Sequence, residues 1–91
     1  MKEISSIKDT VWKEKVYIET AEFKIVGFVY VPKIGKKTRI LTEILNSNKQ
    51  FIAVKNCSLE FKLIPQKEIE YHDFLQVNLS SILIMRPEYE Q

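Results

Sequence analysis

The sequence predicts an α+β, mostly β domain: a small antiparallel barrel or roll of five to six strands with one short helix inserted after the second strand. Short segments rich in β-branched and aromatic residues recur along the 91-residue chain, separated by Pro, Gly and Asn. One segment is apolar on both faces, and another has a helical period. The length fits a single domain, expected over 13–87, between an N-terminal segment 1–12 and a tail 88–91.

The first twelve residues have the apolar spacing i, i+3, i+7, i+8 of one helical face, from Ile4, Ile7, Val11 and Trp12. A short helix is expected there, although its Ser and Thr residues disfavour it. The sequence leaves open whether this segment packs on the domain. Residues 13–20 alternate apolar and polar side chains and predict the first strand. The short link 20–22 joins it to the next strand as a hairpin.

Residues 23–31 predict the second and most apolar strand. One face has Phe23, Ile25, Val29 and Val31, and the other has Val26, Phe28 and Tyr30. A strand that is apolar on both sides is central in a sheet or closes a barrel. Gly27 predicts a bulge or a bend at its middle, and Pro32 is expected to end the pairing.

Residues 38–47 change to a helical period, with Ile40, Leu41, Ile44 and Leu45 on one stripe. The run Asn46–Asn48 supplies residues that tolerate the left-handed conformation at a helix end. A helix this short is unstable alone, so it is expected to dock on the barrel and cover an open end.

The second half of the chain predicts strands and turns. Residues 50–56 form a strand, and 58–64 are either a further strand or its continuation. Pro65 and residues 66–68 form a turn. Residues 71–78 form the next strand, 78–81 a tight turn, and 82–86 the last strand, which Pro87 ends.

Charge and cysteine content exclude some classes of protein. Fourteen Lys and Arg against twelve Asp and Glu give a net charge of +2, which disfavours a dedicated duplex-DNA binder. Cys57 is the one cysteine, so no intrachain disulfide forms. The N-terminus lacks the apolar core of a signal peptide, and no apolar run is long enough to cross a bilayer. We expect a cytoplasmic protein that does not bind membranes.

Catalytic chemistry has little support in the sequence. Cys57 and His72 stand alone without the neighbours of a metal-ligand motif, so neither a metal nor a cofactor is expected. A Cys57–His72 nucleophilic pair requires the fold to bring the two together. His72 and Asp73 do not make a dyad, because adjacent residues of a strand point to opposite faces. The protein is therefore not expected to be an enzyme.

A basic loop after the second strand is the candidate binding site. Lys33, Lys36, Lys37 and Arg39 precede or open the predicted helix, where backbone N–H groups and positive side chains could hold a phosphate or carboxylate. The P-loop motif does not fit, because Tyr30 stands where its leading Gly is required. The alternative, which the sequence favours, is a solvated loop whose lysines maintain solubility.

Six aromatic residues could stack on single-stranded nucleic acid if they were exposed together on one face: Tyr17, Phe28, Tyr30, Phe61, Tyr71 and Phe74. Most lie at positions that the pattern assigns to the core, and no RNA-recognition signature accompanies them. Core packing is the favoured interpretation.

Residues 39–47 (Arg-Ile-Leu-Thr-Glu-Ile-Leu-Asn-Ser), the run 51–54 (Phe-Ile-Ala-Val) and residues 77–87 occur in a recognisable order. Together they resemble an uncharacterised family of small bacterial, mostly β domains. That family has an Arg-Leu-Ser-Asp-like helix start, a Leu-Asn exit, a Phe-Ile strand and a Val-Asn-x-x-x-Ile close. Thr42 and Glu43 depart from its Ser-Asp. The resemblance covers about residues 15–87. It implies a compact, mostly β domain with an unassigned biochemical role, and it transfers no catalytic residue.

The sequence therefore predicts a non-catalytic interaction or regulatory module of unknown partner. It would bind a protein or itself, as a possible oligomer, through an edge strand or an apolar patch. The alternative is nucleic-acid or nucleotide-phosphate binding through the basic loop at residues 33–39.

Overall fold

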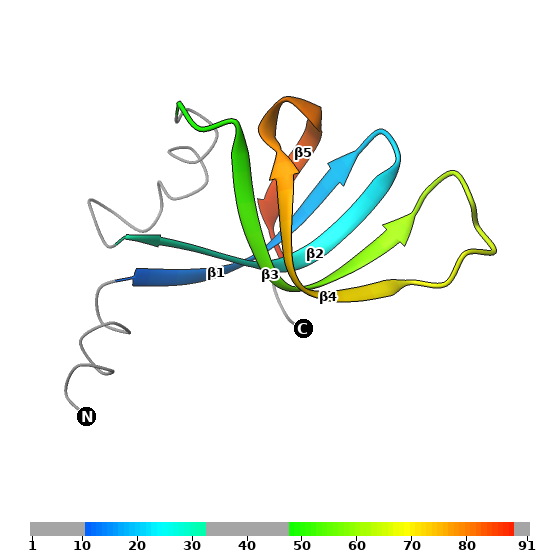
Figure 1. The fold of residues 1–91 in the computed structure, drawn as a ribbon, viewed down its shortest axis with the longest axis horizontal. Helices are drawn as coiled ribbons and strands as arrows, with labels where there is room; N and C mark the ends of the chain where they lie inside the picture. The colour runs from blue at the N-terminus through cyan, green and yellow to red at the C-terminus, as the bar shows by residue number, and fades with distance from the viewer. Residues whose placement is uncertain (1–10, 33–47, 89–91) are drawn as a thin grey trace.

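The computed structural model describes residues 11–32 and 48–88, which form one five-stranded antiparallel sheet (Figure 1). The strands are β1 (Val11–Thr20), β2 (Phe23–Pro32), β3 (Phe51–Phe61), β4 (Glu70–Asn78) and β5 (Ile82–Pro87). A single 3₁₀ turn, η2 (Leu79–Ser81), links β4 to β5. The order across the sheet is β4-β3-β2-β1-β5. The prediction of a small, mostly β, antiparallel domain is confirmed.

The apolar strand predicted at 23–31 is the central strand of the sheet. β2 pairs with β1 on one side and with β3 on the other. Its inward residues Ile25 and Val29 are buried, while Val26 and Phe28 on the opposite face are half-buried. The predicted hairpin is also present, closed by a bend at 21–22, where the Thr20 hydroxyl accepts hydrogen bonds from the backbone N–H groups of Glu22 and Phe23.

β3 and β4 both bend sharply near their middles (Figure 1). In β3 the buried residues are Ile52 and Val54 before the bend and Cys57 after it, so the inward face moves by one residue. Asn56 lies at this step with a positive φ of 49°, a conformation that Asn tolerates better than most residues. The bend therefore lets one strand contribute both of its halves to the same core.

A bulge lies at Gly27, as predicted, but the extra residue belongs to β3. Val26 pairs with Ser58 and Phe28 with Lys55, so Asn56 and Cys57 both lie opposite Gly27. A Cβ atom on Gly27 would lie 2.5 Å from Cβ of Cys57 and 3.0 Å from its Cα. The two strands approach too closely there for any side chain, and glycine is required for this reason.

The core lies on the concave side of the bent sheet and combines residues from β1 to β4. Its buried members are Val16, Ile18, Ile25, Val29, Ile52, Val54, Cys57 and Val77. Partly buried residues at its margin include Phe23, Leu59, Leu75 and Met85.

A closed barrel does not form within the described residues. β4 and β5 are the two edges of the sheet, and no ladder joins them. η2 directs the chain across the end of the sheet to pair with β1, instead of returning it along β4 as a hairpin. Among the described strands, β4 pairs with β3 alone and β5 pairs with β1 alone. The other side of each edge strand therefore has no described partner.

Of the two interpretations left open for residues 58–64, the structure shows the continuation: β3 runs through the bend at Asn56 as one strand and ends at Phe61. One boundary differs from the sequence prediction. β1 begins at Val11, so Val11 and Trp12 belong to a strand and not to the predicted N-terminal helix. The rest of that helix and the helix predicted over 38–47 lie outside the described residues. No helix of the described part is long and apolar enough to cross a membrane.

Candidate functional site

The four residues of the predicted anion site, Lys33, Lys36, Lys37 and Arg39, lie outside the described residues. β2 ends at Pro32, immediately before them. Binding of a phosphate or nucleic acid through this loop therefore stays a prediction.

The fold brings Cys57 and His72 together as direct partners across β3 and β4. The contact joins the Cys57 Sγ to the backbone carbonyl of His72, at 3.6 Å, and leaves the imidazole uninvolved. Burial raises the pKa of the Cys57 thiol, which favours the protonated, unreactive form. This geometry packs a small thiol and does not activate a nucleophile.

The imidazole of His72 instead contacts Glu70, two residues earlier on the same strand, with 2.9 Å between Nε2 and Oε1. Hydrogen bonding to His72 lowers the pKa of the Glu70 carboxyl below its ordinary value, and nearby Lys67 adds to the effect. Within 11–32 and 48–88, no group of three or more His, Cys, Asp or Glu could hold a metal ion.

Core packing is the wrong interpretation for three of the six aromatic residues considered for stacking. Tyr30, Tyr71 and Phe74 are exposed, with 41%, 77% and 52% of their surface accessible. Tyr17, Phe28 and Phe61 are half-buried. Strand pairing places these three rings on the face opposite the core, where they are exposed although the strand pattern is apolar.

A polar cluster fastens the turn between β1 and β2 to the end of β3. The Glu19 carboxylate accepts hydrogen bonds from Lys62 Nζ and from the Tyr17 hydroxyl, the latter at 2.7 Å. Lys62 Nζ also donates to the backbone carbonyl of Thr20, at 3.0 Å. The guanidinium of Arg86 lies over the Tyr17 ring, 4.3 Å from its centroid, and ties β5 to the cluster.

This cluster makes the stability of the fold depend on pH. The hydrogen bonds from Lys62 and Tyr17 lower the pKa of Glu19 below its ordinary value. A carboxyl with a lowered pKa stabilises the folded state above its unfolded pKa and loses that contribution as the pH falls through its folded pKa. We expect Glu19→Gln to unfold at lower urea than the parent chain at pH 7, and the difference between the two midpoints to shrink as the pH is lowered to 3.

Urea midpoints of both chains at pH 7 and pH 3 provide the measurement. Glu68→Gln makes the same charge change at an exposed turn position and should keep the full acid dependence of the parent. An acid dependence in Glu19→Gln equal to that of the parent would show that the cluster does not stabilise the fold.

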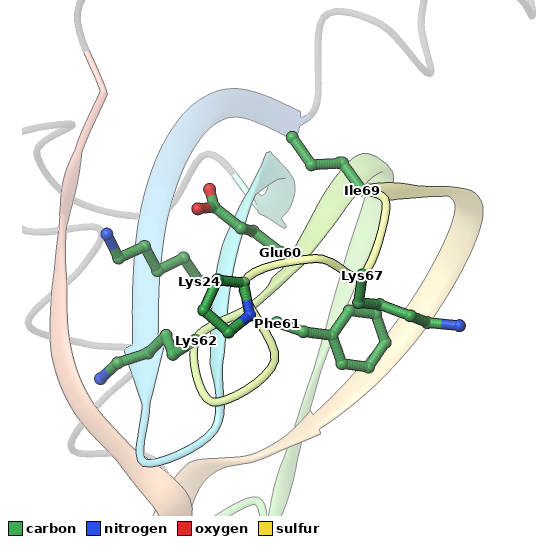
Figure 2. Close-up of a pocket in the computed structure, with 7 residues that line it drawn as sticks. Lys24, Glu60, Phe61, Lys62, Lys67 and Ile69 are labelled. Atoms are coloured by element: carbon green, nitrogen blue, oxygen red, sulfur yellow. The ribbon is translucent and has the colours of Figure 1, made fainter.

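Figure 2 shows a surface hollow of about 440 Å³ beside the turn that follows β3, lined by Lys24, Glu60, Phe61, Lys62, Pro65, Lys67 and Ile69. Its three lysines do not converge. The ammonium groups of Lys24 and Lys62 lie on one side, while that of Lys67 points away on the other (Figure 2). Lys67 pairs with Glu70 and Lys62 with Glu19. The hollow therefore lacks the concentrated positive charge of an anion site.

A second hollow, also of about 440 Å³, opens at the end of the sheet where η2 crosses. It lies between the β1–β2 turn and the β4–η2–β5 connection. We name this part of the sheet the apolar end. Its apolar lining includes Phe23, Leu59, Leu75 and Leu83. The first three pack against the core, whereas Leu83 is 66% exposed. An apolar side chain from another molecule would fit this lining.

The apolar end adjoins the uncharged parts of both edge strands. No charged residue occurs from Phe74 to Met85, which spans the second half of β4, η2 and most of β5. Edge strands of natural proteins are commonly protected by charges, and this part of each edge has none. Sequence reasoning did not identify this site. The twelve-residue run without charge was its detectable signal.

No family model matches this chain, and no curated protein matches it. The fold defines a small, mostly β domain with an open antiparallel sheet. The resemblance drawn from residues 39–87 stays a prediction.

Proposed function

We infer that this protein is a non-catalytic interaction module that binds another polypeptide, either a partner protein or a second copy, through the sheet edge at its apolar end. The observation that supports this function is that an unpaired strand edge and an exposed apolar side chain occur at the same place. The β5 edge has a side without a described strand partner, and the exposed Leu83 lies on it beside the hollow.

A strand of the binding partner, added at this edge, would pair with the open backbone groups and fill the hollow. Its backbone would pair with the open N–H and C=O groups of the edge, as in β-augmentation, and an apolar side chain would fill the hollow. Ile84, which follows Leu83 on β5, is also exposed. Glu19 pairs with Ile84 and Thr20 with Ile82, so the register shift between β1 and β5 falls at Leu83. Burial of Leu83 and Ile84 would provide the apolar contacts of the complex.

Self-association is measured by light scattering over a range of protein concentration, at low and at high salt. We expect a mass above 10.8 kDa that is insensitive to salt, because the contact is apolar. Leu83→Lys places a charge at the centre of the contact and should raise the dissociation constant about tenfold or more. Leu63→Lys, an equally exposed position in the turn after β3, is the matched control and should leave the mass unchanged.

If the parent chain is a monomer, chemical crosslinking in host extract tests the partner form of the same proposal. A protein crosslinked to the parent and to Leu63→Lys, but not to Leu83→Lys, supports it. A monomer whose crosslinked products are the same for all three chains contradicts it.

A further inference from the structure

The outward face of the sheet arranges lysines and aromatic rings in cross-strand rows. Directly opposed residues of neighbouring strands lie on the same face. The register opposes Lys15 to Phe28, Phe28 to Lys55, and Lys55 to Phe74, which makes one row across β1, β2, β3 and β4. Lys13 opposes Tyr30 on the same face. We name this surface the lysine–aromatic face: Lys13, Lys15, Phe28, Tyr30, Lys55 and Phe74.

This surface lies opposite the core. Side chains alternate along a strand, and the neighbouring residues Val16, Val29 and Val54 are buried on the concave side. Phe74 and Tyr30 are both exposed, and Phe28, two residues before Tyr30 on β2, is half-buried. Exposed rings on the uncovered face of a sheet form a platform on which planar groups can stack.

The ammonium groups of the three lysines of this face lie close to its aromatic rings. Lys13 Nζ lies 4.9 Å from the centroid of Phe28, and Lys55 Nζ lies 5.3 Å from that of Tyr30. Lys15 Nζ is 6.0 Å from the Phe28 centroid. Three positive charges thus sit among the rings, where a ligand that stacks would bring its own charge beside them.

A hollow of about 430 Å³ extends the face toward β4. It is lined by Lys15 and Phe28 at one side and by Tyr71 and Asp73 at the other. Tyr71 is the most exposed aromatic of the described residues, at 77%. A planar ring could enter this hollow beside Tyr71, while the carboxylate of Asp73 keeps phosphates on the side of the lysines.

The ligand that matches this arrangement has planar rings joined by negative charges. Unpaired nucleotides have both, whereas duplex DNA hides its bases in the stack. We propose that the lysine–aromatic face binds single-stranded nucleic acid, with Tyr30 and Tyr71 stacking on bases and the three lysines contacting phosphates. This site is separate from the apolar end and does not depend on the function proposed there.

Fluorescence anisotropy of a labelled single-stranded oligonucleotide, titrated with the full chain at low salt, tests the proposal. Three phosphate contacts predict a slope of about −2 in log affinity against log salt. The double variant Lys13→Glu, Lys55→Glu should bind at least about tenfold more weakly and show a smaller slope. Lys24→Glu, Lys67→Glu makes the same charge change at the other end of the sheet and should retain most of the affinity.

Ring removal separates stacking from charge attraction. Tyr30→Ala and Tyr71→Ala should each weaken binding at least about fivefold without changing the salt slope. An unchanged urea midpoint verifies that each variant is folded. Three results would overturn the proposal: no binding at low salt, an equal loss in both lysine double variants, or affinity for an acidic peptide equal to that for the oligonucleotide.

Discussion

Replacing Ile18 with alanine is expected to destabilise the fold by about 3 kcal/mol, within the range of roughly 2–5 kcal/mol for truncating a buried aliphatic side chain. Ile18 has no solvent-exposed surface. It lies on β1 directly between Ile25 of β2 and Met85 of β5, so its side chain joins the central strands to the edge. A cavity there would lie among residues held by two ladders, which limits their ability to collapse into it.

A domain of this length has a total stability of about 5–14 kcal/mol, so the loss is a large fraction of the whole. Urea unfolding followed by circular dichroism should show a lower midpoint with an unchanged slope. Ile64→Ala removes the same atoms from an exposed turn and should change stability by less than about 1 kcal/mol. Similar losses in both variants would show that the core is not where the structure places it.

Gly27→Ala is expected to destabilise the fold by about 3 kcal/mol, although alanine normally stabilises an extended segment relative to glycine by reducing the entropy of the unfolded chain. The added Cβ would lie 2.5 Å from Cβ of Cys57 and 2.7 Å from Cγ1 of Val54. A third contact, at 3.0 Å, is to the backbone Cα of Cys57, which no side-chain rotation relieves. The steric cost therefore exceeds the gain of about 0.4–1 kcal/mol in the unfolded chain.

A double-mutant cycle isolates this contact. Cys57→Gly removes the nearest atom, so Gly27→Ala should cost clearly less in that background than in the parent chain, when both are measured by urea unfolding. Equal costs in the two backgrounds would mean that the close approach of β2 to β3 is not what requires glycine at this position.

Much of the local structure could be predicted because it depends on neighbours in sequence. The hairpin of β1 and β2, the turn at Pro65 and the last strand ending at Pro87 all follow from alternation and from residues that interrupt pairing. The double-faced apolar pattern of residues 23–31 identified the central strand, and Gly27 marked the place at which β3 bulges against it.

The candidate sites were less accessible to sequence reasoning. The predicted basic-loop residues are outside the described part of the chain, and the apolar end combines Phe23, Leu59 and Leu83 from three strands. The pairing of β2 with β3 brings Phe23 near Leu59, and η2 adds Leu83 by directing β5 to β1. Cys57 and His72, fifteen residues apart in the sequence, become neighbours through the register of β3 with β4.

By itself the sequence determined that the fold is mostly β, the position of most of the described strands and turns, and that its own residues contain no clustered metal-ligand or nucleophile motif, since these depend on residue type and local period. The tertiary structure decided which apolar face of each strand is covered, where the sheet edges fall and which side chains lie opposite each other. Tyr30, Tyr71 and Phe74 illustrate the reason. Strand alternation assigns a residue to a face, but only the pairing and bending of all five strands determines which face encloses the core.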